Sequence, residues 1–483
     1  TRLGQFWATI VSIDSVSKLG VGMLLRLIGK EILNNILSFR FAVTYALLFI
    51  LVLVSVFLMG SEHRDRMARF SKQDASLRNR VEELAAMPDV EAQFQAVTRE
   101  DFAGLRKPAT LAILARGLEG TLPTRVSSEN RFIMRSSDDR LGRNVLFEMF
   151  QAPDFAYVVN VVISLLALLF VFDSVCGEKE RGTLKLLMSN SVPRDVVLLA
   201  KWIGGYLSIV APFSVAVVAG FLYLSLSGAV ELDGDDATRF IAILGISFIY
   251  ISAFFSLGLM ISTATHRAST ALLISLLVWI VWILVVPNVA PIVARLAAPV
   301  PARQVIDAEQ RAIDREAQLL QQSIRKRKVY GDQEESERIR READQRKRKL
   351  EDFYKDRLSR QVRLSQNLAR MSPSASYLFS VTRMAGTGPS MLSNFSAATE
   401  RFQADHHEFE MRAYRDGSVT WTRDGPQVPD DWFDADAVPR LQMFQEGAME
   451  ALDAALFDIL LLVVFNVLFF MLSYLFFLRY DVT

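Results

Sequence analysis

The sequence CGEKERGTLKLLMSNSVPRDVVLLAKW, residues 176–202, lies between two long apolar stretches. Its G-E-K-E-R-G-T comes close to the phosphate-binding loop G-x-x-x-x-G-K-[ST], in which a lysine after the second glycine reaches the phosphates. Gly177 and Gly182 have this spacing, but Thr183 stands where the lysine belongs. The preceding apolar stretch is also too long for a core strand, so we expect a loop between membrane spans rather than a nucleotide site.

Six apolar runs are long enough to cross about 30 Å of hydrocarbon. They cover residues 41–60, 156–174, 201–227, 238–262, 270–298 and 455–478. The chain is 51% hydrophobic but also 22% charged, which indicates membrane spans separated by polar lobes. The predicted fold class is an α-helical integral membrane protein with six transmembrane helices and two large exoplasmic, mainly helical insertions.

Lysine and arginine in the short connecting segments predict the orientation, because positive charge is retained in the cytoplasm. With six spans threaded in order, these residues precede span one, separate spans two and three, separate spans four and five, and follow span six. The mostly acidic GAVELDGDDATR, residues 228–239, falls on the opposite side. We therefore expect both termini to be cytoplasmic and residues 61–155 and 299–452 to be exoplasmic.

Residues 1–40 are expected to form a cytoplasmic and interfacial region. A helix through LLRLIGKEILNNILSFRF, residues 24–41, would place Leu24, Leu25, Ile28, Ile32 and Leu33 on one face, with Lys30, Glu31 and Asn34 turned elsewhere. This pattern suits a helix in the membrane interface. A cytoplasmic extension packed on its own partner helices is the alternative.

The two exoplasmic segments differ in pattern. Residues 61–155 read as a small mixed domain, whereas residues 303–371 predict two helices of about 28 and 38 residues joined at Gly331 and Asp332. Such a hairpin suits an antiparallel stalk, with only an imperfect heptad. Its basic runs are interleaved with acids, which favours a solvated helix face over nucleic-acid binding.

Other chemistry has little support in the sequence. His406, His407 and Glu408 lack further residues to complete a metal site, so no metal is expected. Cys176 is interpreted as a small interfacial residue. The spans carry almost no ionisable group at mid-membrane depth, which disfavours ion-coupled transport, and no catalytic constellation indicates an enzyme. Pro287 and Pro291 should kink span five or end it in a re-entrant turn.

If the spans carry no power source, the quoted loop is a reasonable attachment for one. A helix over residues 178–189 would place Leu184, Leu187 and Met188 on one side and Glu178, Arg181 and Lys185 on another. Ser191 and Pro193 would then cap a helix that runs into span three. A helix of this kind suits a groove on another protein.

These residues resemble a known family, the six-span permease subunits of ABC exporters of the second type. The quoted loop is similar to that family's E-x-E-x-G-T-L-x-x-L-L pattern, with Arg194 and Lys201 leading into span three, although Ser191 stands where many relatives have proline. The resemblance implies a coupling helix seated in a cleft of a separate ATPase subunit, which binds ATP and Mg²⁺. It assigns this contact to Glu178, Glu180, Arg181, Gly182, Thr183, Leu186, Leu187 and Arg194.

The same resemblance implies an elbow helix in RLIGKEILNNILSFRF, with Lys30, Glu31 and Arg40. A subgroup with large insertions after spans one and five is a closer match, because SPSASYLFSVTRMAGTGPSMLSNFSAATERF, residues 372–402, resembles its S-P...G-T...F segment. We expect a permease paired with a second copy or a paralogue, which exports a lipid-like or amphipathic substrate or passes motion to envelope partners. A membrane-anchored scaffold or sensor is the alternative.

Overall fold

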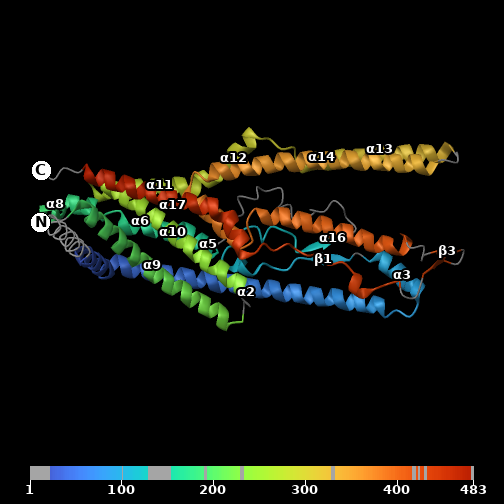
Figure 1. Ribbon diagram of the computed structural model, residues 1–483, viewed down its shortest axis with the longest axis horizontal. Coiled ribbons are helices and arrows are strands. Elements are labelled where there is room, and N and C mark those ends of the chain that lie inside the picture. The colour runs from blue at the N-terminus through green and yellow to red at the C-terminus, as the bar shows by residue number, and fades with distance from the viewer. Residues whose placement is uncertain are drawn as a thin grey trace, which may run out of the picture. The chain divides into compact units, whose positions relative to one another are not determined.

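The computed structural model describes residues 22–100, 102–128, 154–189, 193–228, 233–327, 332–415, 420–422, 425–428 and 432–479. These residues are nearly all helical (Figure 1). Six helical segments are long and apolar enough to cross a membrane, which confirms the predicted fold class at this level: Phe41–Ala85, Phe155–Glu180, Arg194–Leu226, Gly234–Ala264, Ala268–Ala297 and Ala448–Leu478.

The helix of span one, α2 (Phe39–Ala85), has 47 residues and is about 70 Å long. It begins at Ser38, whose hydroxyl accepts a hydrogen bond from the backbone N–H of Phe41 at 3.2 Å. The helix continues well past residue 60, where the apolar run ends, because no glycine or proline interrupts the charged residues that follow until Pro88.

Span two is built from several helical pieces: α5 (Phe155–Tyr157), the π-helical η3 (Val158–Ile163), α6 (Ser164–Val171) and α7 (Cys176–Glu180). Asp154 caps the first piece, since its side chain accepts a hydrogen bond from the N–H of Tyr157 at 2.7 Å. The wide η3 turn contains Asn160, a buried polar residue.

Helix α10 (Gly234–Ala264) lies at the centre of the bundle, in contact with α6, α9 (Arg194–Leu226) and α17 (Ala448–Leu478). Asn466 of α17 accepts a hydrogen bond from Ser256 at 2.9 Å and donates one to Ser252 at 2.6 Å. Trp202 of α9 also donates to Ser256, at 2.8 Å. Such polar bonds join helices in a membrane, where apolar side chains gain little by leaving lipid.

Span five remains helical from α11 (Ala268–Ile280) through the π-helical η4 (Val281–Val285) and α12 (Val286–Ala297). The predicted re-entrant turn is therefore wrong. Pro287 follows the wide η4 turn, so the regular hydrogen bonding of the helix is interrupted where the proline lacks an N–H, and the chain nevertheless stays helical.

The chain divides into two compact units, one of residues 1–280 and 376–483 and the other of Val281–Ala375. The second unit contains η4, α12 and the helical hairpin α13 (Arg303–Arg327) and α14 (Asp332–Ala369), which lie side by side (Figure 1). Arg303 bonds Glu351 at 2.9 Å and Asp314 bonds Lys347 at 2.7 Å. These pairings confirm the predicted antiparallel hairpin.

In the first unit, the second half of α2 lies beside a group of shorter elements (Figure 1). They are α3 (Val90–Arg99), β1 (Ala103–Leu105), η1 (Thr110–Ile113), β2 (Arg125–Ser127), α16 (Ser390–Arg415), β3 (Thr420–Thr422), β4 (Gly425–Gln427) and η5 (Ala435–Ala437). The strand pairs β1–β2 and β3–β4 are both antiparallel. Leu84, Val97 and Phe102 form a core that Phe409 and Trp432 help to cover.

Helix α15 (Pro373–Met384) binds the spans to these shorter elements. Tyr377 stacks on Tyr250 of α10 with ring centroids 4.3 Å apart, and the Tyr250 hydroxyl donates to the Asn160 side chain at 2.8 Å. Just beyond α15, the Thr387 carbonyl accepts a hydrogen bond from the N–H of Leu118 at 2.8 Å. The segment after the hairpin is therefore part of the first unit's interior.

Candidate functional site

The candidate site is the segment between spans two and three. It contains α7, α8 (Thr183–Ser189) and the start of α9. The prediction of one helix over residues 178–189 is wrong, because the chain turns at Arg181 and Gly182 between α7 and α8. Gly182 has φ +74°, in the left-handed region that favours glycine. Ser191, the predicted cap of the next helix, lies outside the described residues, and α9 begins after Pro193.

The inner side of this segment holds the ends of two spans. The Lys179 ammonium donates to the carbonyls of Thr263 and Thr265, the latter at 3.1 Å, where α10 ends. The Glu180 carboxylate accepts a hydrogen bond from the N–H of Ala268 at 3.1 Å, where α11 begins. A cation at a helix C-terminus and an anion at an N-terminus both match the helix dipole.

Three charged side chains join the segment to span three and to the N-terminal helix. The Lys201 ammonium of α9 lies 2.7 Å from a carboxylate oxygen of Glu178 and 3.0 Å from one of Glu31. The Lys201 side chain is 3% exposed, and the two glutamates are about a quarter exposed. A buried ammonium is stable only with such partners, so Lys201 fixes three elements at one point.

A helix covers residues 22–36, where the resemblance predicts the elbow helix. Glu31 turns inward to Lys201, while Leu25 and Leu33 of the predicted apolar face are exposed. Gly204 of α9 allows this contact, since a Cβ built there would lie 2.8 Å from the Glu31 Cβ. Lys30 is exposed, and the side chain of Arg40 lies outside the described part of the chain.

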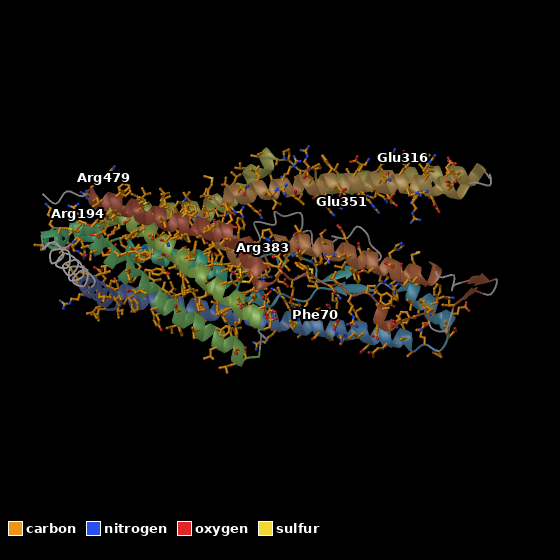
Figure 2. The ribbon with its side chains drawn as sticks, in the orientation of Figure 1. Phe70, Arg194, Glu316, Glu351, Arg383 and Arg479 are labelled. Carbon is orange, nitrogen blue, oxygen red and sulfur yellow. The ribbon has the colours of Figure 1, made fainter. Side chains whose placement is uncertain are left out.

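Arg194 joins the segment to span six. Its guanidinium donates to the carbonyl of Leu478 at 2.8 Å, at the end of α17. Figure 2 shows Arg194 and Arg479 at the same end of the first unit's helices and Arg383 near their other end. The bond therefore closes the bundle on the side where α7 and α8 lie.

The outer side of the segment is exposed. Glu180, Arg181, Gly182, Thr183 and Leu186 are all exposed. Leu186 is 69% exposed, whereas Leu184, two residues earlier, is completely buried and anchors α8. The side chain of Leu187 lies outside the described residues. The described side chains thus present charges of both signs around the exposed Leu186, above a base that is fixed by hydrogen bonds.

One histidine and the cysteine considered as candidate reactive residues are both buried. His406 is buried beside the rings of Phe102, Phe402 and Phe409. Cys176 is fully buried. Within the described ranges, no three His, Cys, Asp or Glu side chains gather as metal ligands would.

The sequence matches a known family over nearly its whole length. The family model described as "ABC-2 family transporter protein" matches residues 25–482, from the elbow helix to the end of span six. The chain belongs to the ABC-2 family. In ABC-2 permeases the membrane subunit is not itself an enzyme, and a separate ABC ATPase subunit hydrolyses ATP.

One relative of this ABC-2 protein is the "Probable ABC transporter permease protein NosY" of Stutzerimonas stutzeri. The two are 28% identical over 134 residues, which is 27% of this chain and 47% of NosY. The chain therefore matches about half the length of this curated relative.

Sequence reasoning named most of the residues that hold the site together but missed the bonds between them. The pattern included Lys201 but gave it no partner, and Lys179 and Glu180 carried no sign that they bond the ends of α10 and α11. A lysine at the start of an apolar span is a usable signal, because a buried cation requires an acceptor.

Proposed function

We propose that this ABC-2 chain is the permease of an ATP-driven exporter, and that the exposed tip of α7 and α8 contacts the ATPase subunit. The single observation that supports this is the fixed base of the tip: α7 and the start of α9 bond the ends of α10, α11 and α17 and the N-terminal helix. A force applied at the tip would therefore reach spans three to six together.

The residues divide into two roles. Glu180, Arg181, Gly182, Thr183, Leu186 and Leu187 form the contact, with Leu186 inserted in a cleft of the ATPase subunit and the charges around it paired. Glu178 and Arg194 have partners within the chain, and we assign to them the positioning of the segment. Glu180 has both roles, because its exposed carboxylate also accepts a hydrogen bond from the N–H of Ala268. The chain itself binds no nucleotide, and ATP and Mg²⁺ lie in the partner subunit.

The proposed cycle requires two permeases, either two copies of this chain or this chain and a paralogue. ATP binding draws the two coupling segments together and moves each bundle as a rigid body between two arrangements. The described spans have few charged side chains, and Lys201 and Arg239 are paired near the helix ends. Such spans suit a lipid-like or amphipathic cargo that moves out from the membrane.

The topology belongs to the same proposal. We place the chain in the bacterial inner membrane with α7 and α8 in the cytoplasm, and the insertions after spans one and five outside, as in the subgroup with large insertions. The hairpin α13–α14 and the elements beside α2 are then available to pass motion to an envelope protein. A scaffold or sensor without transport remains the competing hypothesis.

The test is the variant Arg181→Glu in the complex with the ATPase subunit, reconstituted in lipid. We expect cargo-stimulated ATP hydrolysis to fall at least about tenfold, because a reversed charge in the contact is repelled. Membrane insertion should be unchanged, and Arg338→Glu in the exposed part of α14 is the matched control. An unaltered stimulated rate, or purification without any ATPase, would favour the scaffold.

A further inference from the structure

The extended segment that follows η5 has an unused hydrogen-bonding edge. Residues 438–447 form neither helix nor strand. Between Val438 and Gln445, no backbone N–H or C=O has a hydrogen-bond partner within the described protein. Backbone groups that are buried are nearly always paired, whereas those of this half-buried and exposed segment remain available to a binding partner.

The side chains of this segment alternate as in a β-strand. Half-buried and exposed residues follow one another in turn: Pro439, Arg440, Leu441, Gln442, Met443 and Phe444. Leu441 faces β1, because a Cβ built on Gly104 would lie 2.8 Å from the Leu441 Cβ. A period of two with one side packed is the pattern of a half-buried strand. The segment is therefore shaped as a strand, although no described strand pairs with it.

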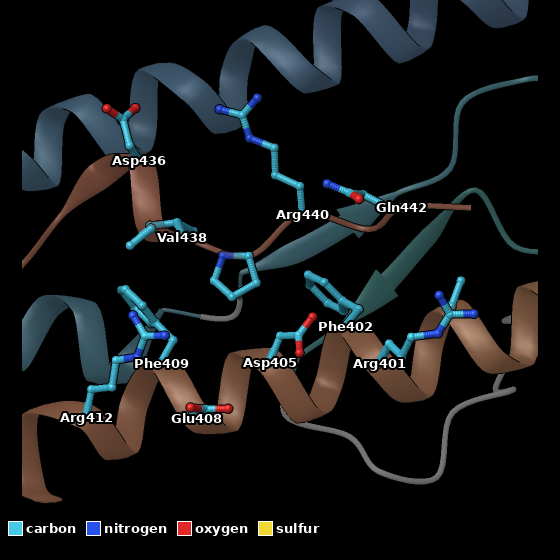
Figure 3. Close-up of a pocket in the computed structure, with 13 residues that line it drawn as sticks. Arg401, Phe402, Asp405, Glu408, Phe409, Arg412, Asp436, Val438, Arg440 and Gln442 are labelled. Atoms are coloured by element: carbon cyan, nitrogen blue, oxygen red, sulfur yellow. The ribbon is translucent and has the colours of Figure 1, made fainter. Parts of the chain in front are cut away.

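A groove of about 640 Å³ runs between this segment and α16. Figure 3 shows the side chains of Phe402 and Asp405 rising from α16 toward the extended segment. Phe402 is almost completely buried beneath the groove, so its exposed apolar surface comes from the half-buried Phe409, with Val438 and Pro439 on the opposite wall. The groove is therefore mainly polar, and it lies beside a backbone segment without partners among the described residues.

The charges on the two walls are also unused. Six charged side chains line the groove: Arg401, Asp405, Glu408, Arg412, Asp436 and Arg440. In the part of the chain that the structure describes, none of these six makes an ion pair. All six are exposed. A ligand with charges of both signs could pair with either wall without displacing an existing partner.

We infer that the groove binds an extended segment of another polypeptide, which pairs its backbone with residues 438–444. Seven residues of strand span about 23 Å. In such strand addition, the main-chain bonds supply affinity and the flanking pockets supply selectivity. A suitable segment has acidic and basic side chains around one apolar residue that reaches the half-buried Phe409. A lipid offers no row of alternating donors and acceptors, so we assign the groove to a peptide.

The probe is a peptide selected from a phage-displayed library of random decapeptides against the full chain in lipid nanodiscs. The best binder is then synthesised with a single N-methyl group at each backbone position in turn. We expect binding to fall at least about tenfold at every second position, since each methyl removes one backbone donor. Equal binding by all N-methylated peptides would overturn the pairing.

Two variants locate the binding. Asp405→Trp fills the groove and should weaken peptide binding at least about tenfold, because the bulky ring occupies the peptide's place. His407→Trp is the matched control, since His407 is also exposed on α16 but does not line the groove. Selection of the same peptides by the Asp405→Trp chain, or of no peptide by the unmodified chain, would overturn the site.

The inference goes beyond the proposed function, and their failures can be told apart. ATP hydrolysis by the complex with the ATPase subunit should be unchanged by Asp405→Trp when no peptide is present. Loss of coupling in Arg181→Glu tests the transporter, and the N-methyl pattern tests the groove. Amide hydrogen exchange of residues 438–445 gives a second readout, because peptide binding should slow exchange at alternate residues.

Discussion

At the scale of the residue, the buried charges do more than the exposed ones to define the site. Lys201 has two carboxylate partners on different elements, and the second carboxylate oxygen of Glu178 is buried without a hydrogen bond. A buried charge pair is weak evidence for stability, but loss of one partner leaves an unpaired charge. The triad of Lys201, Glu31 and Glu178 is thus sensitive to change at its centre.

The variant Lys201→Met should lower the free energy of unfolding by about 2–3 kcal/mol. This loss is smaller than that expected when a fully buried ion pair is broken, because both glutamates here are partly exposed. Thermal unfolding of the purified protein measures this, with Lys201→Arg as the control that keeps the charge. Addition of Glu31→Gln and Glu178→Gln to Lys201→Met should restore much of the loss. If Lys201→Met alone unfolds like the unmodified chain, the triad does not hold these elements together.

Asp154 predicts a dependence on pH. Burial raises the pKa of this carboxyl to about 7, while hydrogen bonds from the N–H groups of Arg116 and Tyr157 oppose the rise. Between pH of about 4 and 7 the folded chain then binds more protons than the unfolded chain. The free energy of unfolding therefore falls as the pH rises through this window, by up to about 4 kcal/mol.

In the variant Asp154→Asn, the free energy of unfolding should decline less steeply between pH 4 and 7 than in the unmodified chain. Thermal unfolding at a series of pH values measures this. Asp89→Asn is the matched control, because Asp89 also caps a helix, α3, but is exposed. If both variants keep the slope of the unmodified chain, Asp154 does not titrate in this range.

At the scale of the element, the break between α7 and α8 determines which side chains are exposed. The turn at Gly182 separates the residues that bond α10 and α11 from the exposed start of α8. Leu184 then anchors α8 while Leu186 faces outward. If α7 and α8 formed one uninterrupted helix, Leu184 and Leu186 would point in other directions relative to the residues of α7 that bond α10 and α11.

The variant Gly182→Ala should therefore impair coupling without preventing membrane insertion. The left-handed backbone costs a residue with a Cβ about 1 kcal/mol, even though no atom blocks a Cβ at this position. We expect reduced cargo-stimulated ATP hydrolysis by the complex. Gly29→Ala in the elbow helix is the control, because that position is also open but has no positive φ. Equal activity of both variants would show that the turn is not needed.

Sequence periodicity predicted the six spans and the helical hairpin because both depend on local patterns. Hydropathy located α10 and α17, and the charged repeat located α14. The same patterns missed the turn at Gly182, since helical periodicity does not report the φ angle of a glycine. They also missed the inward position of Glu31 and the bonds among Asn160, Tyr250 and Tyr377, because these depend on contacts between residues far apart in the sequence.

At the scale of the whole molecule, the two units differ in what stabilises them. The first unit has a large apolar interior with hydrogen bonds across its spans. The hairpin of the second unit buries fewer apolar side chains, such as Ile306 and Ile324, and has ion pairs, Arg303–Glu351 and Asp314–Lys347, that are partly exposed. Exposed pairs each contribute little, so we expect the hairpin to open more readily than the bundle.

The hairpin also allows the proposed topology to be tested. In the double variant Asp314→Cys and Lys347→Cys, a membrane-impermeant bis-maleimide should cross-link α13 to α14 in intact cells, because the native side chains are 2.7 Å apart. Lys185→Cys in α8 is the control, which should react only after the cells are permeabilised. Cross-linking of the hairpin only in permeabilised cells would place it in the cytoplasm.

The bond network between α10 and α17 also bears on biosynthesis. Ser252 and Ser256 receive Asn466 only after the ribosome has synthesised some two hundred further residues. Until then, the nascent α10 carries two hydroxyls without these partners toward lipid or toward an insertion chaperone. A chain truncated before α17 keeps that surface uncovered, which gives membrane quality-control proteases a feature by which to recognise an unfinished protein.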